Sequence, residues 1–460
     1  MRKQIFGIEN NFLAILIICL SFPWLITRYT SVFSVAIVGA AFILVLMRKS
    51  IGYFLFIALL SCIPSQFGAD ADSSVFTFVN RYCEYFPILL ALLYIPFVKK
   101  SKFIRSELII FIALFCLCTL WYIIAMKNEE ITILFKYGLF FSLLILFYKS
   151  SITREEFYKM YDSVALVAGI YMAIEFFLRI APYEEFINYG VDGIEQFDIA
   201  SAFRPNGILG NPLTSTIVFL MELVFLFVRY LETNKINIIL IILTFFFCLL
   251  CVSRTAIAGA ILIVAVSFFL KVKSSKKIPW KLYLFIGVGV AVVVSVFGIA
   301  IDFLLQRVSD GGGPDVGITF RLSNYFSVYN LVCDHPLGVG VSNLIRYIET
   351  QYAGPGWIPG FVTLDNFFLT AIGEYGLFSF IPIFFYFYWF IYTRKRKNNT
   401  VTYQLSFLIM ITFLFVSFSY DWETYNFILA ALGGILGVVM RDFEKSSTCL
   451  TNNMVNKPVL

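Results

Sequence analysis

Long apolar runs recur along the whole chain, and they constrain its fold more than any other feature. Of its 460 residues, 60% are hydrophobic and only 14% are charged. A helix needs about 20 mostly apolar residues to cross a bilayer. By this rule the sequence predicts an all-α, polytopic transmembrane helix bundle of about 14 spans. A soluble domain of this size does not have such a composition.

The apolar runs also predict the topology. The predicted spans cover residues 11–28, 31–47, 51–65, 75–97, 107–126, 131–148, 161–180, 212–230, 236–252, 255–271, 282–301, 366–392, 402–420 and 425–440. An even number of spans places both termini on one side. The connections on that side hold most of the 35 Lys and Arg, which predicts that both termini are cytoplasmic. The net charge of +6 is spread between spans and does not indicate a nucleic-acid partner.

The longest polar connection divides the chain into three predicted parts. Residues 1–301 hold eleven spans, residues 302–365 form a large extracytoplasmic loop, and residues 366–460 hold three spans and a cytoplasmic tail. A long connection with helical patterns of its own is typical of a working part rather than a tether.

Two short helices are predicted inside this loop. Their apolar faces are expected to lie over the bundle as a lid, and the second helix covers residues 342–352. The apolar stripe of the first helix has helical spacing and consists of Leu322, Tyr325, Phe326, Tyr329 and Val332.

The basic residues left for the outer side and the spans are mainly Arg, whereas the cytoplasmic ones are mainly Lys. Arg presents a planar fork that holds phosphate oxygens in pairs. Arg204 precedes a turn and a helix start, and Arg254 lies in a short connection before a span rich in small residues. These positions predict a bound anion at the outer surface. The alternative is that these are interfacial arginines that reach lipid headgroups.

Candidate bases lie at the end of the loop. Asp365 and Asn366 stand where the chain enters the next predicted span, and Glu374 lies about two and a half turns deeper. His335 is the only histidine, but it stands beside Pro336 in a predicted helix-ending turn. Asp365 is therefore the better candidate.

Four motifs, taken in order, resemble a known family. They are R-x-x-G-x-x-x-N-P from Arg204, S-R-T-A from Ser253, R-x-x-x-Y from Arg321 followed by H-P-L-G-V-G-V-S-N, and D-N-F-F-L-x-x-x-x-E-x-G-L from Asp365. Together these segments resemble the O-antigen polymerase and O-antigen ligase superfamily of bacterial integral membrane glycosyltransferases.

This resemblance implies a function and a set of roles. A glycan would pass from an undecaprenyl diphosphate carrier to an acceptor on the outer face of the inner membrane, without cofactor or metal and with inversion. Expected partners are the carrier-linked donor and acceptor, membrane lipids and a chain-length regulator. Arg204 and Arg254 would bind the diphosphate, and Arg321 would be a third positive group or a glycan contact. Asp365 would be the base, with Asn366 a substrate contact or only a helix cap.

One position separates the two branches of the superfamily. Ligases resemble H-N at the start of the late span, with histidine as the base, whereas this chain has Asp365. The difference favours a polymerase of lipid-linked repeat units. A ligase acting on the lipid A core is the alternative. A transporter or flippase of lipid-linked glycan is the alternative from another class, although transporters place their sites near the midplane, often in inverted repeats.

Overall fold

The computed structural model describes residues 87–88, 91, 132–178, 205, 207, 209, 211–274, 316–340, 343–354, 364–384, 386–387 and 400–455. Within these ranges every regular element is helical and no strand is present, in agreement with the all-α prediction. Apart from residues 87–88 and 91, which are helical, the predicted spans before residue 131 lie outside the described residues, as do the span at 282–301 and Arg204.

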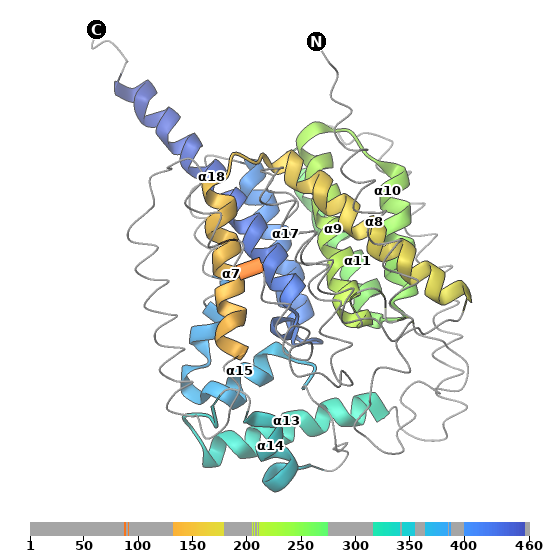
Figure 1. Ribbon diagram of the computed structural model, residues 1–460, viewed down its shortest axis with the longest axis vertical. Helices are drawn as coiled ribbons and strands as arrows, with labels where there is room; N and C mark the ends of the chain where they lie inside the picture. Colours follow the sequence, from red (N-terminus) through yellow and green to blue (C-terminus); the bar gives the residue numbers. More distant parts are fainter. Residues whose placement is uncertain are drawn as a thin grey trace, which may run out of the picture.

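Seven of the described helices form a bundle (Figure 1). They are α7 (Thr132–Lys149), α8 (Arg154–Leu178), α9 (Pro212–Thr233), α10 (Ile238–Leu250), α11 (Arg254–Ser274), α17 (Thr400–Ser417) and α18 (Asn426–Val455). Each corresponds to a predicted span. By length and apolar composition, α8, α9 and residues Arg254–Val272 of α11 are the described helices able to cross a membrane.

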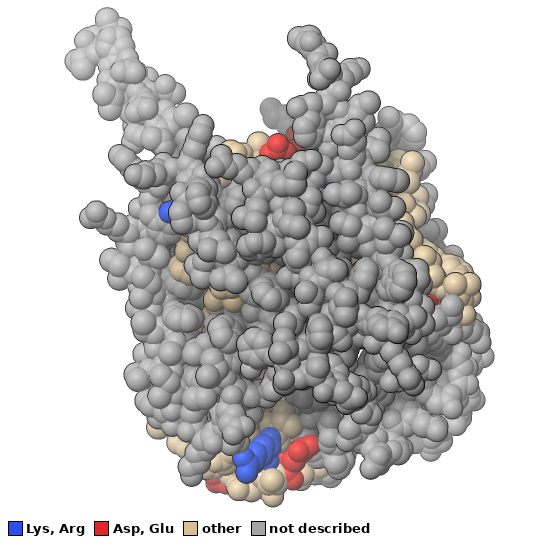
Figure 2. Space-filling view, in the orientation of Figure 1, with Lys and Arg blue, Asp and Glu red and all other residues tan. Residues whose placement is uncertain are grey.

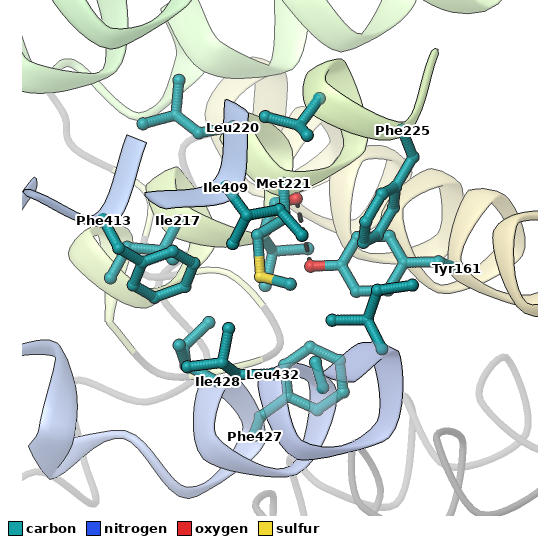
Figure 3. Close-up of a cluster of buried hydrophobic side chains, with 14 of the residues drawn as sticks. Tyr161, Ile217, Leu220, Met221, Phe225, Ile409, Phe413, Phe427, Ile428 and Leu432 are labelled. Atoms are coloured by element: carbon teal, nitrogen blue, oxygen red, sulfur yellow. Dashed lines mark hydrogen bonds between the residues drawn. The ribbon is translucent and has the colours of Figure 1, made fainter. Parts of the chain in front are cut away.

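Helix α9 is the centre of this bundle, and α8, α10, α11, α17 and α18 all contact it. Its apolar side chains are buried on every side, as in a helix surrounded by other helices. Figure 3 shows this core, where Ile217, Met221 and Phe225 of α9 meet Tyr161 of α8 and Phe427 of α18. The Tyr161 hydroxyl donates to the Val218 carbonyl at 3.2 Å, so its polar atom is satisfied within the apolar cluster.

Helices α7 and α18 pack along each other at close range. A Cβ built on Gly433 of α18 would lie 2.2 Å from the Phe140 oxygen of α7, and one on Gly437 would lie 2.3 Å from the Leu144 oxygen. The pair is spaced four residues apart, the small-xxx-small pattern that lets membrane helices approach closely. Any larger side chain at either position would push these helices apart.

Ion pairs gather at the end of the bundle where α7 and α9 finish. Arg154 contacts Glu232 at 3.1 Å and Asp442 at 2.7 Å, which joins α8 to α9 and α18. Arg229 pairs with Asp162, tying α9 to α8 a second time. The predicted topology places this end in the cytoplasm.

The loop helices lie at the opposite end (Figure 1). Helix α13 (Val316–Asp334) runs across the bundle and contacts α15 (Phe367–Tyr375). After α13 come α14 (Leu344–Tyr347) and the π-helical turn η4 (Ile348–Tyr352), which together match the second predicted loop helix. The 3-10 turns η5 (Gly376–Phe378) and η6 (Trp422–Thr424) follow α15 and α17.

The predicted orientation of α13 is wrong. Its apolar stripe faces outward, with Leu322 55%, Tyr325 47%, Phe326 62% and Tyr329 69% exposed, and of the five stripe residues only Val332 packs against the neighbouring loop cluster. The buried face is partly polar instead. Ser323, Asn324 and Ser327 lie inside, together with Val328 and Leu331.

Hydrogen bonds explain why the polar face is inside. The Asn324 amide donates to the Leu364 carbonyl at 3.1 Å, and the Ser327 hydroxyl accepts from the Gly354 amide at 3.2 Å. These two bonds attach α13 to the residue before Asp365 and to the chain just after η4. They also satisfy the Asn324 amide nitrogen and the Ser327 hydroxyl, whose burial would otherwise be costly. Among the described residues the buried Ser323 hydroxyl has no hydrogen-bond partner.

The span predicted over residues 366–392 is interrupted. Helix α15 ends at Tyr375, and Gly376 adopts a positive φ of 55° before the chain turns through η5 and resumes as a helix near Phe380. The sequence did not predict this break, because one glycine hardly lowers the mean hydropathy of an apolar run. The interruption separates the entry segment of the late span from its deeper part.

Candidate functional site

Asp365 and Asn366 begin α15 at the end of the bundle that faces α13. The Asn366 side chain is only 4% exposed, and its oxygen accepts from the Leu369 amide at 3.1 Å as an N-cap. Its amide nitrogen donates to the Tyr325 hydroxyl at 3.0 Å and to the Phe418 carbonyl at 3.2 Å. Asn366 therefore joins α13, α15 and the end of α17, and is more than a helix cap.

Asp365 stands just outside this cap. Its φ of 51° lies in the left-handed region, where Asp and Asn are tolerated better than other non-glycine residues. The side chain is half-buried. A carboxylate held at a helix entry between loop and bundle has the position that the sequence predicted for it.

Arg254 is the first residue of α11, and its side chain is exposed. Only Cys251, Val252 and Ser253 separate it from α10, and Val252 has a φ of 47°. The short connection predicted before the small-residue span is thus confirmed. Farther along α11, a Cβ on Gly259 would lie 2.8 Å from Leu220 of α9, so the small residue admits a close helix contact.

The connection between α17 and α18, residues 418–425, links these separate segments. The Tyr420 hydroxyl bonds with the Ser253 hydroxyl, next to Arg254. The Tyr420 carbonyl accepts from the Phe367 amide at 3.2 Å, next to Asn366. Tyr420 thus spans from the start of α11 to the start of α15.

The same connection contacts two further segments. Asp421 accepts from the Thr370 hydroxyl of α15 at 2.8 Å. The Tyr425 hydroxyl accepts from the Asn211 amide nitrogen at 3.2 Å, and Asn211 is the N-cap of α9. Sequence reasoning missed Tyr420, Asp421 and Tyr425, although a cluster of aromatic and acidic residues between two spans was a signal.

The turn before α9 is held by a buried carboxylate. Gly207, with φ of 73°, donates its amide to Glu175 of α8 at 2.7 Å, and Glu175 is almost fully buried. A Cβ on Gly207 would lie 2.9 Å from the Ser215 hydroxyl, so the turn fits tightly between α8 and α9. This turn follows the predicted ligand Arg204. Glu175 is a fourth residue that sequence reasoning missed.

The H-P-L-G-V-G motif docks the loop onto α15. Val339 and Gly340 donate to the carbonyls of Gly373 and Glu374 at 3.1 and 2.9 Å, and Leu377 donates back to the Pro336 carbonyl at 2.9 Å. We call the segment Pro336–Gly340 the docking turn. A Cβ at position 338 would lie 2.3 Å from the Glu374 oxygen, and the φ there is 78°. Close backbone approach is therefore what the motif provides.

His335 takes part in the packing of the loop. Its ring meets the edges of Tyr347 and Tyr352, with centroids 5.5 and 6.1 Å apart, directly after α13 ends. Partial desolvation and the hydrogen bond from Tyr352 to the Asp334 carboxylate, 3.0 Å long, raise the pKa of the Tyr352 phenol. These contacts favour the structural interpretation of His335.

Arg321 lies in α13, and this helix contacts α15, which starts beside Asp365. Figure 2 shows basic and acidic side chains together at this end, where Figure 1 places α13 and α14. Among the described residues, no three His, Cys, Asp or Glu side chains are grouped so as to hold a metal ion.

An apolar groove of about 700 Å³ opens beside Asn366. It runs between α15, the helical segment after η5, and α17, and Tyr325 of α13 stands at its edge. Its lining consists of Tyr325, Asn366, Phe368, Leu369, Ile372, Ser379, Phe380, Ile383, Phe384, Phe387, Met410, Leu414 and Phe418. The lining is almost entirely aromatic and aliphatic, so the groove suits a hydrocarbon chain.

The sequence was compared with models of known protein families and with curated proteins. Residues 239–384 match the family model of the O-antigen ligase domain. No curated protein matches the chain at a significant level. The matched region includes Arg254, α13, the docking turn and the start of α15, and it confirms the resemblance to the O-antigen polymerase and ligase superfamily. Over residues 239–384 the chain is therefore similar to O-antigen ligases, and its apolar helices indicate an integral membrane protein.

Proposed function

We propose that this enzyme is a polymerase that joins undecaprenyl-diphosphate-linked oligosaccharide repeat units into O-antigen or a related surface polysaccharide. It would act at the outer face of the inner membrane, with both termini in the cytoplasm. The observation that carries the proposal is the apolar groove that is lined in part by Asn366, the residue after Asp365.

The groove supports a lipid-linked substrate. An isoprenoid chain is hydrocarbon throughout, and burying it contributes about 25 cal/mol for each Å² removed from water. The polar groups among the lining residues are few, and Asn366 is one of them. A chain lying in the groove would therefore leave its diphosphate and sugar near the start of α15.

The charges around this point suit glycosyl transfer. Arg254 stands at the start of α11, joined to the start of α15 through Ser253 and Tyr420. Its guanidinium would hold the donor diphosphate, assisted by Arg204 and Arg321. Positive groups aimed at the leaving diphosphate stabilise the negative charge that it gains in the transition state.

Asp365 would supply the base. The acceptor hydroxyl oxygen attacks the anomeric carbon, and the new glycosidic C–O bond forms as the bond from that carbon to the diphosphate breaks. The diphosphate leaves with the bonding electron pair, and the Asp365 carboxylate takes the hydroxyl proton. Attack opposite the leaving group inverts the anomeric centre. An aspartate in place of the ligase histidine is what favours the polymerase branch.

The test uses cells that make the matching lipid-linked repeat unit. The gene is deleted and complemented, at matched expression, with wild type, Arg254→Ala, Asp365→Asn or the control Arg346→Ala. Asn keeps the left-handed backbone at position 365 while removing the base. Arg346 is an exposed arginine of α14, a helix that holds none of the proposed site residues. Glycan is then separated as a ladder on a gel.

We expect both site variants to lose the long ladder while single repeat units stay attached to the lipid core. That result requires intact ligation and therefore establishes polymerisation. Loss of all glycan from the core, with polymer accumulating on the carrier, would establish a ligase instead. Carrier-linked repeat units trapped inside the cell would indicate a transporter. An unchanged ladder in both variants would overturn the assignment of Arg254 and Asp365.

A further inference from the structure

We infer that α13 is an interfacial helix whose exposed stripe of Leu322, Tyr325, Phe326 and Tyr329 lies in the lipid of the outer leaflet. The partner of this surface is the bilayer itself. The inference is independent of the proposed reaction, because it concerns where α13 lies and not what is transferred.

The first support is the inverted polarity of α13. In a water-exposed loop, the apolar side of an amphipathic helix faces the protein and the polar side faces water. Here Ser323, Asn324 and Ser327 are buried, and Asn324 and Ser327 are hydrogen-bonded within the loop, whereas Phe326 and Tyr329 are more than 60% exposed. This polarity is stable only where the surroundings of the helix are apolar.

The second support is continuity with the membrane-facing surface of the bundle. Tyr325 lines the same groove as Phe380, Phe384 and Phe418, and these three phenylalanines are themselves exposed. Phe418 directly follows α17, one of the bundle helices. The stripe of α13 and the exposed aromatic residues of the bundle thus form one apolar surface.

The third support is orientation. Helix α13 lies across the bundle helices in Figure 1, which is the direction of a helix lying in the plane of a membrane surface. Its 19 residues span about 28 Å. Arg346 and Glu349, which follow in α14 and η4, are exposed. Figure 2 shows basic and acidic side chains on the surface at this end of the molecule. The loop therefore presents charged groups to water as well as an apolar stripe to lipid.

A sugar-binding platform is the competing interpretation of exposed aromatic residues. Such platforms combine ring faces with hydrogen-bonding groups. On α13 the stripe includes Leu322 and Phe326, which offer none, and the Tyr325 hydroxyl already accepts from Asn366. Tyrosine is also a residue enriched where a membrane meets water. The composition of the stripe favours lipid.

The experiment places a genetically encoded fluorescent amino acid at Phe326 or at Thr350 in the full chain. Thr350 is exposed, lies in η4 and serves as the matched control from the same loop. Each variant is reconstituted into vesicles whose phosphatidylcholine carries bromine atoms on its acyl chains. Bromine quenches fluorescence on contact, so emission reports whether the side chain touches the hydrocarbon.

We expect emission at position 326 to fall at least about twofold relative to unbrominated vesicles, and emission at position 350 to stay unchanged. Equal emission in both lipids at position 326 would overturn the inference. Emission that changes at position 326 only when soluble repeat-unit glycan is added would assign the stripe to sugar and also overturn it.

A second pair of variants does not depend on the fluorophore. Phe326→Asp would place a charge in lipid, whereas Asn330→Asp changes an exposed polar residue of the same helix. We expect the first alone to lower the thermal midpoint of the protein in vesicles, because burying a charge in hydrocarbon is costly. Equal midpoints would contradict the lipid contact even if the enzyme proved to be a polymerase.

Discussion

Asn366 shows how one side chain can do more than its position in the sequence predicts. Asp and Asn are equally good N-caps. Asn366→Asp would therefore be neutral if capping were its whole role. The Asn366 amide nitrogen, however, donates to the Phe418 carbonyl. A carboxylate at this position would have no proton to donate, and its negative charge would face an oxygen that can only accept. We expect the substitution to lower the unfolding free energy by about 1–3 kcal/mol.

Asn237 provides the matched control for this prediction. It caps α10 by accepting from the Leu240 amide, and its side chain is exposed. We expect Asn237→Asp to be neutral or slightly stabilising, since a negative charge suits a helix N-terminus. Thermal unfolding in detergent compares the two variants. Equal midpoints would show that Asn366 is only a cap.

Tyr420 is the second residue whose role is tertiary. Removing its hydroxyl in Tyr420→Phe leaves Ser253 without this partner, beside Arg254. We expect a loss of about 1 kcal/mol in stability and a shortened glycan ladder. The control is Tyr158→Phe, because the buried Tyr158 hydroxyl has no hydrogen-bond partner among the described residues and its removal should cost nothing. A wild-type ladder and midpoint in Tyr420→Phe would contradict a positioning role.

These residues mark the limit of what the sequence could predict about the site. Arg254, Asp365 and Asn366 stand in motifs at span entries, so spacing and hydropathy sufficed to locate them. Nothing in the spacing relates Ser253 to Tyr420, which lies 167 residues later. Contacts of that kind follow from helix packing, and periodicity holds no information about them.

Among the elements, the docking turn offers the sharpest test. In Gly338→Ala the new Cβ would lie 2.3 Å from the Glu374 oxygen, at a φ that costs a non-glycine residue about 1–2 kcal/mol. We expect the Val339 and Gly340 amides to exchange their hydrogens about tenfold faster or more, since their bonds to α15 would weaken. Hydrogen-exchange mass spectrometry measures this.

Gly138→Ala in α7 is the control for that substitution. The nearest atom to a Cβ there is 3.6 Å away, an ordinary contact, and alanine favours a helix over glycine by about 0.5–1 kcal/mol. Its exchange at the docking turn should match that of wild type. An unchanged exchange rate in Gly338→Ala would show that the turn is not held by close backbone approach.

The helices themselves were largely predictable, and the exception is instructive. Apolar length located each bundle helix, because the bilayer sets that length. It missed the polar ends of two of them, since α8 begins at Arg154 rather than at 161 and α18 runs to Val455 rather than to 440. The stripe of α13 was found but given the wrong direction. The rule that apolar faces point to the protein core assumes water outside, and it reverses where lipid surrounds the helix. The break at Gly376 was missed because hydropathy averages over a glycine.

For the molecule as a whole, substituting one arginine at each end of the bundle should separate stability from activity. Arg154 joins α8 to α9 and α18 through Glu232 and Asp442. We expect Arg154→Ala to lower stability by about 1 kcal/mol, less at high salt, and to leave the glycan ladder unchanged. Arg254→Ala should abolish the ladder at nearly wild-type stability. Salt-dependent unfolding and ladder gels of both variants test this contrast. Loss of the ladder in both variants would contradict the assignment of stability to the Arg154 end and of activity to the Arg254 end.

The outward-facing stripe of α13 also bears on how the loop can be used as a reagent. A loop fragment made without its membrane would present Phe326 and Tyr329 to the buffer, and such fragments associate through exposed apolar patches. Antibodies raised against the fragment would recognise a face that the living cell covers. An immunogen meant to recognise the protein in its membrane should display the exposed residues of α14 and η4 instead, such as Arg346 and Thr350.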